Sequence, residues 1–135
     1  MPATKSPGKT VRPRNTAGRF RIKRVYEPAS KDDGLRVLVD RLWPRGIAKQ
    51  KAHIDRWLRD LSPSDALRRM VHADPAKWDD FVKAYGRELK QEPARTALAD
   101  LRKLPRSRPV TLLYAARDEA HNNAVALKRL LARAK

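Results

Sequence analysis

Three short apolar segments of the chain predict β-strands. The first spans residues 20–26, where Phe20 and Ile22 alternate with basic side chains. The second and third, residues 35–40 and 110–116, are nearly continuously apolar and short, as strands buried on both faces are. Proline, glycine and aspartate residues between 28 and 34 predict a turn that separates the first two strands.

Between the second and third strands, the apolar residues recur with helical spacing. Ile54, Trp57, Leu58 and Leu61 fall at i, i+3, i+4 and i+7, which predicts a helix over residues 54–61. Four further helices are expected from their capping or proline signals, which are Ser64, Asp74 with Pro75, Pro93, and Asp118.

Strands and helices therefore alternate along the chain. The long helical connection between the second and third strands is typical of a crossover between parallel strands. We expect residues 20–135 to form one small α/β domain, with a largely parallel sheet of about three strands and helices packed on it. The link between the first two strands is too short for a standard crossover. That pair is therefore either antiparallel or joined by a tight irregular connection.

Length and composition limit the classes of protein that fit this chain. A chain of 135 residues with 41% hydrophobic residues allows one domain with its own core. The absence of cysteine excludes a disulfide framework, a thiolate metal site and a cysteine nucleophile. The longest uncharged apolar run, residues 110–116, is too short to span a bilayer, and no apolar signal core follows Met1. We therefore expect a cytoplasmic protein with no membrane partner.

The positive charge is unevenly distributed. The 32 Lys and Arg residues outnumber 15 Asp and Glu residues, for a net charge of +17. Residues 1–24 hold eight of the basic residues and no acidic one. We interpret residues 1–19 as a disordered basic arm, because their polar composition cannot bury enough apolar surface to order them. The basic residues of the arm, counted through to the first strand, are Lys5, Lys9, Arg12, Arg14, Arg19 and Arg21.

The arm has several interpretations. One is a sequence-independent contact to nucleic acid, driven by counterion release. The others are a solvated tail without a partner, or an overextended start of the chain. A transit peptide is a further idea, but Pro2, Pro7 and Pro13 disfavour the amphipathic helix that it needs.

Polar and aromatic residues follow two of the predicted strands. In open α/β sheets, ligands bind beyond the carboxyl ends of the strands, so residues 40–46 and 114–123 are expected to converge. Arginine donors there suit a phosphate or carboxylate, as does the N-terminus of the last helix. Asp40 and His121 are the candidates for proton transfer. The candidate ligand-binding residues are Arg41, Trp43, Arg45, Tyr114, Arg117 and Asn122.

Each candidate also has a purely structural interpretation. Asp40 then forms an ion pair with Arg41 or Arg45, or a hydrogen bond within the turn. Trp43 and Tyr114 belong to the core, and His121 faces solvent. Three scattered histidines and no cysteine argue against structural zinc, whereas a carboxylate-bound magnesium ion stays open. No phosphate-binding or dinucleotide-binding glycine motif occurs, so no cofactor is identified.

Three segments resemble a known family. They are residues 24–29, residues 33–46 with the run V-D-R-L-W-P-R-G, and residues 111–118 followed by His121 and Asn122. Together they resemble the YeaO-like branch of the domain-of-unknown-function 488 family, over roughly residues 22–131. The resemblance implies a bacterial or archaeal α/β domain whose biochemical role is uncharacterised, so it supplies no reaction.

Two departures from the family pattern limit what the resemblance implies. The larger branch of the family carries cysteines near the end of its last strand, where Tyr114 and Ala115 stand here, so thiol chemistry does not carry over. Arg117 stands where lysine is common in the YeaO-like branch, which keeps the charge and changes the donor geometry.

Three functions remain in competition at this point. The first is an enzyme or binding domain for a small anionic ligand. The second is a nucleic-acid-binding accessory protein that uses the basic arm. The third is a protein-interaction module, which an exposed apolar patch on Trp57, Trp78 or the C-terminal helix would favour.

Deleting residues 1–19 tests the second function. We expect the full chain to bind DNA and RNA with an affinity that falls steeply as salt rises, and the truncated chain to bind more weakly. Fluorescence anisotropy of labelled oligonucleotides at several salt concentrations measures both effects. Equal binding by the two proteins would show that the arm is not responsible.

Overall fold

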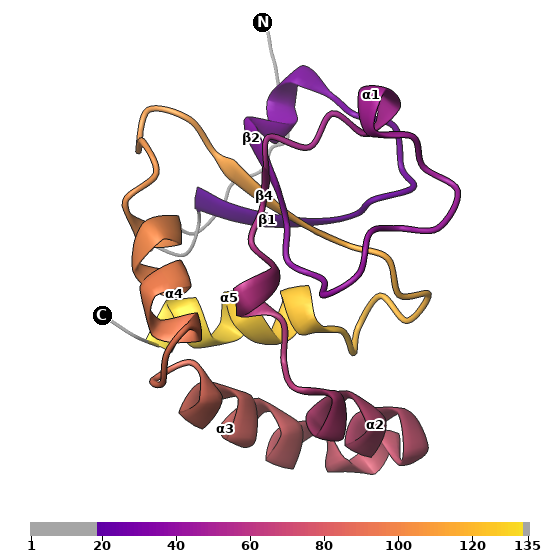
Figure 1. Ribbon diagram of the computed structural model, residues 1–135, viewed down its shortest axis with the longest axis vertical. Helices are drawn as coiled ribbons and strands as arrows, with labels where there is room; N and C mark the ends of the chain where they lie inside the picture. The colour runs from indigo at the N-terminus through magenta and orange to yellow at the C-terminus, as the bar shows by residue number, and fades with distance from the viewer. Residues whose placement is uncertain (1–18, 134–135) are drawn as a thin grey trace, which may run out of the picture.

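Four parallel strands form a single sheet in the computed structural model, in the order β1-β4-β2-β3 (Figure 1). The structure describes residues 19–133, so Lys5, Lys9, Arg12 and Arg14 of the predicted arm lie outside the described residues. The strands are β1 (Phe20–Arg24), β2 (Leu35–Leu38), β3 (Arg56–Trp57) and β4 (Val110–Tyr114).

The sheet confirms the predicted α/β class and decides how the first two strands are related. Strand β4 pairs in parallel with β1 on one side and with β2 on the other. Strands β1 and β2 therefore point the same way without being neighbours. The fourth strand, β3, is only two residues long, and its pattern did not predict a strand.

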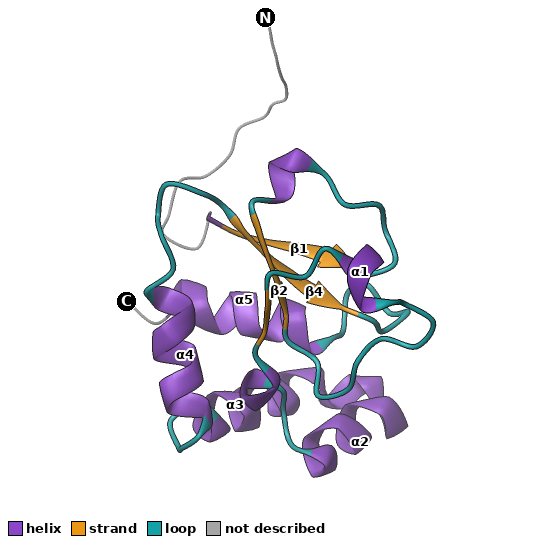
Figure 2. Ribbon diagram, turned by 45° about the horizontal axis from the view of Figure 1, so that its top comes forward, coloured by secondary structure: helices purple, strands orange, loops and turns teal. Residues whose placement is uncertain are grey.

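The helices divide unequally between the two faces of the sheet. Helices α2 to α5 cover one face, and the short α1 with its flanking loops lies over the other (Figure 2). Because side chains alternate along a strand, Val37 and Leu112 face the four longer helices, whereas Leu38 and Leu113 pack with Trp43 and its neighbours. The helices are α1 (Lys49–Ala52), α2 (Asp65–Ala73), α3 (Trp78–Glu88), α4 (Ala94–Arg102) and α5 (Asn123–Arg133).

The capping signals for the middle helices are confirmed. The Ser64 hydroxyl accepts the backbone N–H of Leu67 at the start of α2. Asp74 accepts the N–H of Ala76 at the start of a 3₁₀ turn, Pro75–Lys77, that leads into α3. Helix α4 begins directly after Pro93. No helix among residues 19–133 is long and apolar enough to cross a bilayer.

Two helix predictions are wrong in detail. Residues 54–61 form β3 and a 3₁₀ turn, Arg59–Leu61, instead of a helix. The last helix begins at Asn123, and Asn122 caps it by accepting the N–H of Val125. Asp118 instead accepts the N–H groups of Ala120 and His121 in the turn before that helix.

Basic residues near β1 and β2 contact the folded domain. The Arg19 guanidinium donates to the carbonyls of Leu104 and Pro105, and Arg21 lies within β1. Arg36 is buried, pairs with Asp33, and donates to the backbone carbonyls of Ala52 and His53. Arg36 thereby holds the end of α1 against β2.

A glycine before β2 allows a close approach to the backbone of Pro109. Gly34 has a φ of 65°, and a Cβ on it would lie 2.1 Å from the carbonyl oxygen of Pro109. That carbonyl accepts the N–H of Leu35, so the contact sets the register of β2 against β4.

Gly34→Ala is therefore expected to be strongly destabilising. Gly46→Ala is the matched control, because Gly46 also has a positive φ, 81°, but nothing lies within 4 Å of its missing Cβ. The control should lose about 1–2 kcal/mol of unfolding free energy through backbone strain alone. Gly34→Ala should lose more, because the backbone of Pro109 must also move. Urea denaturation followed by tryptophan fluorescence measures both, and equal losses would contradict the proposed close approach.

Candidate carboxyl-edge site

The predicted convergence of residues 40–46 with residues 114–123 depends on the pairing of β2 with β4. Their carboxyl ends are adjacent, and the Asp40 carboxylate accepts the backbone N–H of Ala115 at 2.9 Å. The indole N–H of Trp57 donates to the Asp40 carbonyl at 2.8 Å. Asn123 donates its side-chain N–H to the carbonyl of Val39 at 2.7 Å. Asp40 and its neighbours thus join β2, β3, β4 and the start of α5.

The Asp40 side chain is partly buried. Burial raises its pKa, and the nearby Asn123 side chain, the hydrogen bond from the Ala115 N–H and the charge of Arg68 lower it only in part. A carboxyl with a raised pKa at a strand end is a candidate for proton transfer. Here, however, the same oxygen atoms hold the sheet edge together.

Tyr114 and Asn122 are also engaged within the protein. Both are buried. Burial raises the pKa of the Tyr114 hydroxyl, which therefore stays neutral, and the nearby Asn122 side chain lowers that pKa only in part. Asn122 also donates to the Asp118 carbonyl at 2.9 Å while it caps α5.

His121 lies in the turn before α5 and is held from two sides. Its Nδ1 lies 3.1 Å from a carboxylate oxygen of Asp118, and its ring packs edge-on against Trp78 at 5.0 Å between centroids. The N–H groups of Ala120 and His121 lower the pKa of Asp118, with a further contribution from the His121 side chain. The Asp118 carboxylate is therefore ionised beside the imidazole.

Trp43 belongs to the smaller apolar cluster. Its indole N–H donates to the Ile47 carbonyl at 2.6 Å, and its ring lies 5.5 Å from that of Trp57 in an edge-to-face arrangement. The ring therefore packs against its own protein rather than standing free as a stacking surface.

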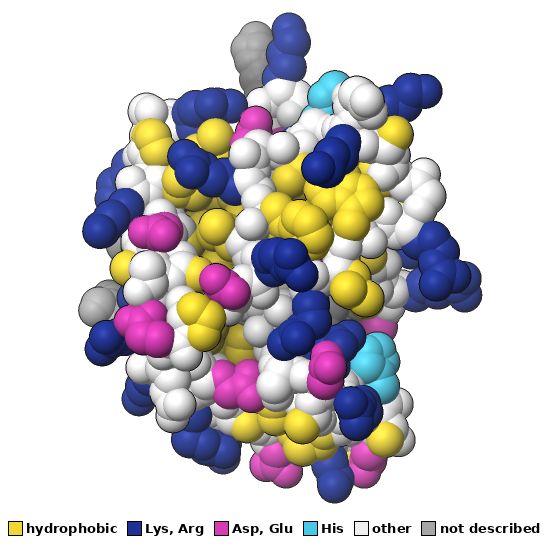
Figure 3. All heavy atoms as spheres, viewed as in Figure 1, with side chains coloured by type: hydrophobic (Ala, Val, Ile, Leu, Met, Phe, Trp, Pro, Cys, Tyr) yellow, Lys and Arg dark blue, Asp and Glu magenta, His cyan; other side chains and the backbone are white. Residues whose placement is uncertain are grey.

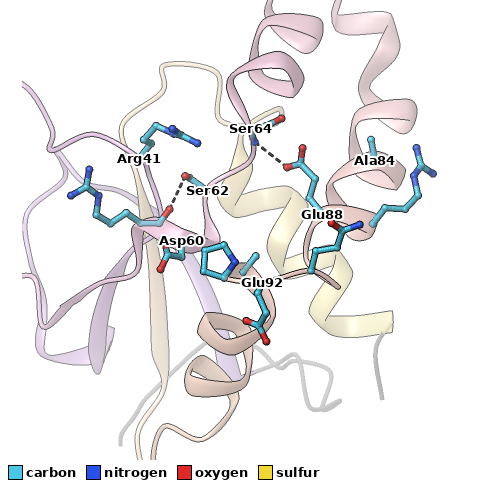
Figure 4. Close-up of a pocket in the computed structure, with 12 residues that line it drawn as sticks. Arg41, Asp60, Ser62, Ser64, Ala84, Glu88 and Glu92 are labelled. Atoms are coloured by element: carbon cyan, nitrogen blue, oxygen red, sulfur yellow. Dashed lines mark hydrogen bonds between the residues drawn. The ribbon is translucent and has the colours of Figure 1, made fainter.

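Arg41 lies apart from the other candidates. It lines a polar cavity of about 830 Å³, where it lies across from Glu88 (Figure 4). Its guanidinium is 3.8 Å from Asp65, and Glu88 accepts the N–H of Ser64. None of the other seven sequence-predicted site residues lines this cavity, whose walls carry both acidic and basic side chains.

Two residues at the end of β1 connect the remaining candidates. Arg24 donates to the carbonyls of Ala115 and Ala116, and its guanidinium lies 4.7 Å from the centre of the Tyr26 ring. The Tyr26 hydroxyl donates to the Arg45 carbonyl at 2.8 Å. Sequence reasoning missed Arg24, the last residue of β1, and Tyr26, which lies two residues beyond β1 just as Asp40 lies two residues beyond β2.

We call the exposed part of this edge the carboxyl-edge surface, defined by Tyr26, Arg45 and Arg117. A cavity of about 280 Å³ opens beside it, lined in part by Tyr26, Gly46 and Lys51. Arg45 and Arg117 are exposed, and within residues 19–133 neither forms an ion pair. Their guanidinium donors are thus available to a ligand.

The described residues also bear on metal binding. Between residues 19 and 133, no group of three or more His, Asp or Glu side chains is arranged to hold a metal ion.

Comparison with known proteins places this geometry in a family context. Residues 19–135 match a family model described as the inactive DUF488-N3 subclade. The uncharacterized protein Rv3073c of Mycobacterium tuberculosis is 43% identical over 113 residues, which cover 84% of this chain and 93% of that protein. The uncharacterized protein YeaO of Escherichia coli K12 is 43% identical over 109 residues, covering 80% and 92%. No solved structure matches the chain.

Asp40→Asn tests the electrostatic state of this edge. Because the pKa of Asp40 is raised in the folded state, its stabilising contribution is complete below the unfolded pKa and is lost as pH rises through the folded pKa. The asparagine variant has no such ionisation. The stability of the variant relative to wild type should therefore increase as pH rises from 4 to 8.

Urea denaturation of both proteins across that pH range measures the difference. Using the difference cancels the carboxyls whose pKa is lowered, such as Asp33 and Asp118, because both proteins share them. A difference that is constant, or that moves against the variant as pH rises, would contradict the buried state of Asp40.

Proposed function

The chain belongs to the DUF488 family, in its inactive DUF488-N3 subclade, and on this premise we propose a non-catalytic domain that binds a small anion. The resemblance to YeaO-like proteins indicated by the sequence motifs is confirmed by the relatives of 43% identity. The proposed ligand carries a phosphate or carboxylate group and binds at the carboxyl-edge surface.

The state of the candidate catalytic groups supports binding without catalysis. A general acid or base must reach a substrate proton. The Asp40 carboxylate is hydrogen-bonded to the Ala115 N–H, and His121 is held between Asp118 and Trp78. Both are engaged in joining parts of the fold, which agrees with the description of the subclade as inactive.

The free guanidinium groups carry the proposal. Arg45 and Arg117 lie in the segments that follow the neighbouring strands β2 and β4, and the adjoining cavity, which neither arginine lines, carries Lys51 and Glu27. Guanidinium groups bind phosphate and carboxylate oxygens with two parallel hydrogen bonds. A cavity of about 280 Å³ suits a small ligand rather than a polymer.

The other two functions have less support from the described residues. The acid-free arm lies largely outside them. On the face in Figure 3, Lys and Arg side chains are spread among Asp and Glu rather than gathered in one stripe. Trp57 and Trp78 are partly buried, whereas the exposed large apolar side chains are Leu42 at 68% and Tyr26 at 43%.

Binding of simple anions tests the proposal. Inorganic phosphate, pyrophosphate and citrate are titrated by calorimetry into the wild type, the double variant Arg45→Ala/Arg117→Ala, and the control Arg69→Ala/Arg108→Ala. The control removes the same charge from α2 and from the opposite edge of the sheet. At least one anion should bind the wild type and the control alike. The site variant should bind it at least about tenfold more weakly, as loss of a charge-assisted hydrogen bond predicts.

Two results would contradict the proposal. One is that none of the three anions binds the wild type. The other is that both double variants lose the same affinity, because the loss would then reflect net charge rather than a site at the carboxyl edge.

A further inference from the structure

A second cavity lies in the helical layer. It has a volume of about 580 Å³ and is enclosed by α3, α4 and α5. Helices α3 and α5 run side by side, and α4 lies across their C-terminal ends (Figures 1 and 2). The cavity shares no lining residue with the carboxyl-edge surface.

The interior of this cavity is formed by leucines. Leu89, Leu127 and Leu131 are buried at its base, and Leu98 and Leu130 are partly exposed at its mouth. Gly86 of α3 adds no side chain to the cavity, and a Cβ there would lie 3.2 Å from Leu130 Cδ2. The lining is therefore apolar, as in most sites for small organic ligands.

The charged side chains that line the cavity are all basic. They are Lys83 and Arg87 on α3, Lys90 in the turn that follows, and Arg102 on α4. Each is exposed, so its charged group stands at the mouth while the leucines form the interior. An apolar interior with a positive rim is complementary to a molecule that is apolar along its length and negative at one end.

We propose that this cavity binds a small anionic amphiphile, a carboxylate with a saturated hydrocarbon chain. The hydrocarbon packs against the leucines, and the carboxylate pairs with Arg102 and the lysines of the rim. A free phosphate would leave the leucines uncovered. An acidic amphipathic helix laid between α3 and α5 would meet α4, whose Leu98 and Arg102 line the same cavity.

The experiment compares decanoate with decan-1-ol, which has the same chain length and no charge. Calorimetric titration into the full chain should give binding of decanoate and clearly weaker binding of the alcohol. Arg102→Glu should weaken decanoate binding about tenfold and leave the alcohol unaffected. Lys103→Glu is the matched control, because it makes a similar charge reversal one residue away, outside this cavity. Lys103→Glu should change neither the affinity for decanoate nor the affinity for decan-1-ol.

A second variant tests the apolar interior. Leu98→Gln should weaken binding of decanoate and of decan-1-ol together, because both lose the same apolar contact. Far-ultraviolet circular dichroism and the thermal midpoint show whether each variant is folded. If Leu98→Gln does not fold, the comparison of Arg102→Glu with wild type decides the test.

Three results would overturn the inference: equal affinity for the two ligands, equal loss of decanoate binding in the two charge reversals, or binding of an acidic amphipathic peptide without binding of decanoate. Arg45→Ala/Arg117→Ala should leave decanoate binding unchanged, so this inference and the carboxyl-edge proposal succeed or fail separately.

Discussion

The insertion of β4 between β1 and β2 is the constraint on which the rest of the structure depends. Ten residues separate β1 from β2, and they must return along the strands and cross two strand spacings, about 10 Å. Ten extended residues reach about 33 Å, so the link is long enough to do this without a helix. The space between β1 and β2 is filled by β4, which comes from near the C-terminal end of the chain. All five residues of β4 are buried, and its Thr111 hydroxyl donates to the Asp33 carbonyl.

This arrangement brings three strand ends together and exposes their backbone groups. Beyond the ends of the strands, Ala115 and Ala116 have lost their ladder partners, and buried N–H and C=O groups need replacements. Asp40 supplies an acceptor for the Ala115 N–H, and the Arg24 Nε–H is a donor that the two carbonyls share. The position where α/β sheets usually present reactive groups to a ligand is thus occupied by groups that complete the sheet. The arginines that remain exposed beyond this edge are Arg45 and Arg117.

Local signals explain which parts of the fold could be predicted from the sequence. Short apolar runs identified β1, β2 and β4, and the signals at Ser64, Asp74 and Pro93 identified α2, α3 and α4. Strand β3 was missed because its apolar spacing imitates a helix. Ile54 and Trp57 pack on one face of the sheet, whereas Leu58 and Leu61 pack in the core on the other. A strand followed by a 3₁₀ turn therefore produced the i, i+3, i+4, i+7 pattern.

The candidate site was predictable only as far as backbone topology determines it. Parallel pairing of β2 and β4 brings Asp40 and Tyr114 to one edge, and both positions follow from the strand assignments. The direction of a side chain beyond the strand end does not follow from them. Arg41 lies next to Asp40 in sequence, yet it lines the polar cavity of about 830 Å³. Trp43 packs against the smaller apolar cluster.

The arginines show why net charge does not by itself identify a binding site. Arg36 is buried against Asp33 and two carbonyls, and Arg24 donates to the end of β4, so both are part of the fold. Arg45 and Arg117 have the same charge, but within the described residues their guanidinium groups form no ion pair. A guanidinium offers five donors, and only donors that the protein leaves unbound can recognise an anion. In the proposed function, recognition of an anion therefore depends on where the arginines end relative to the carbonyls of the sheet, which the net charge of +17 does not specify.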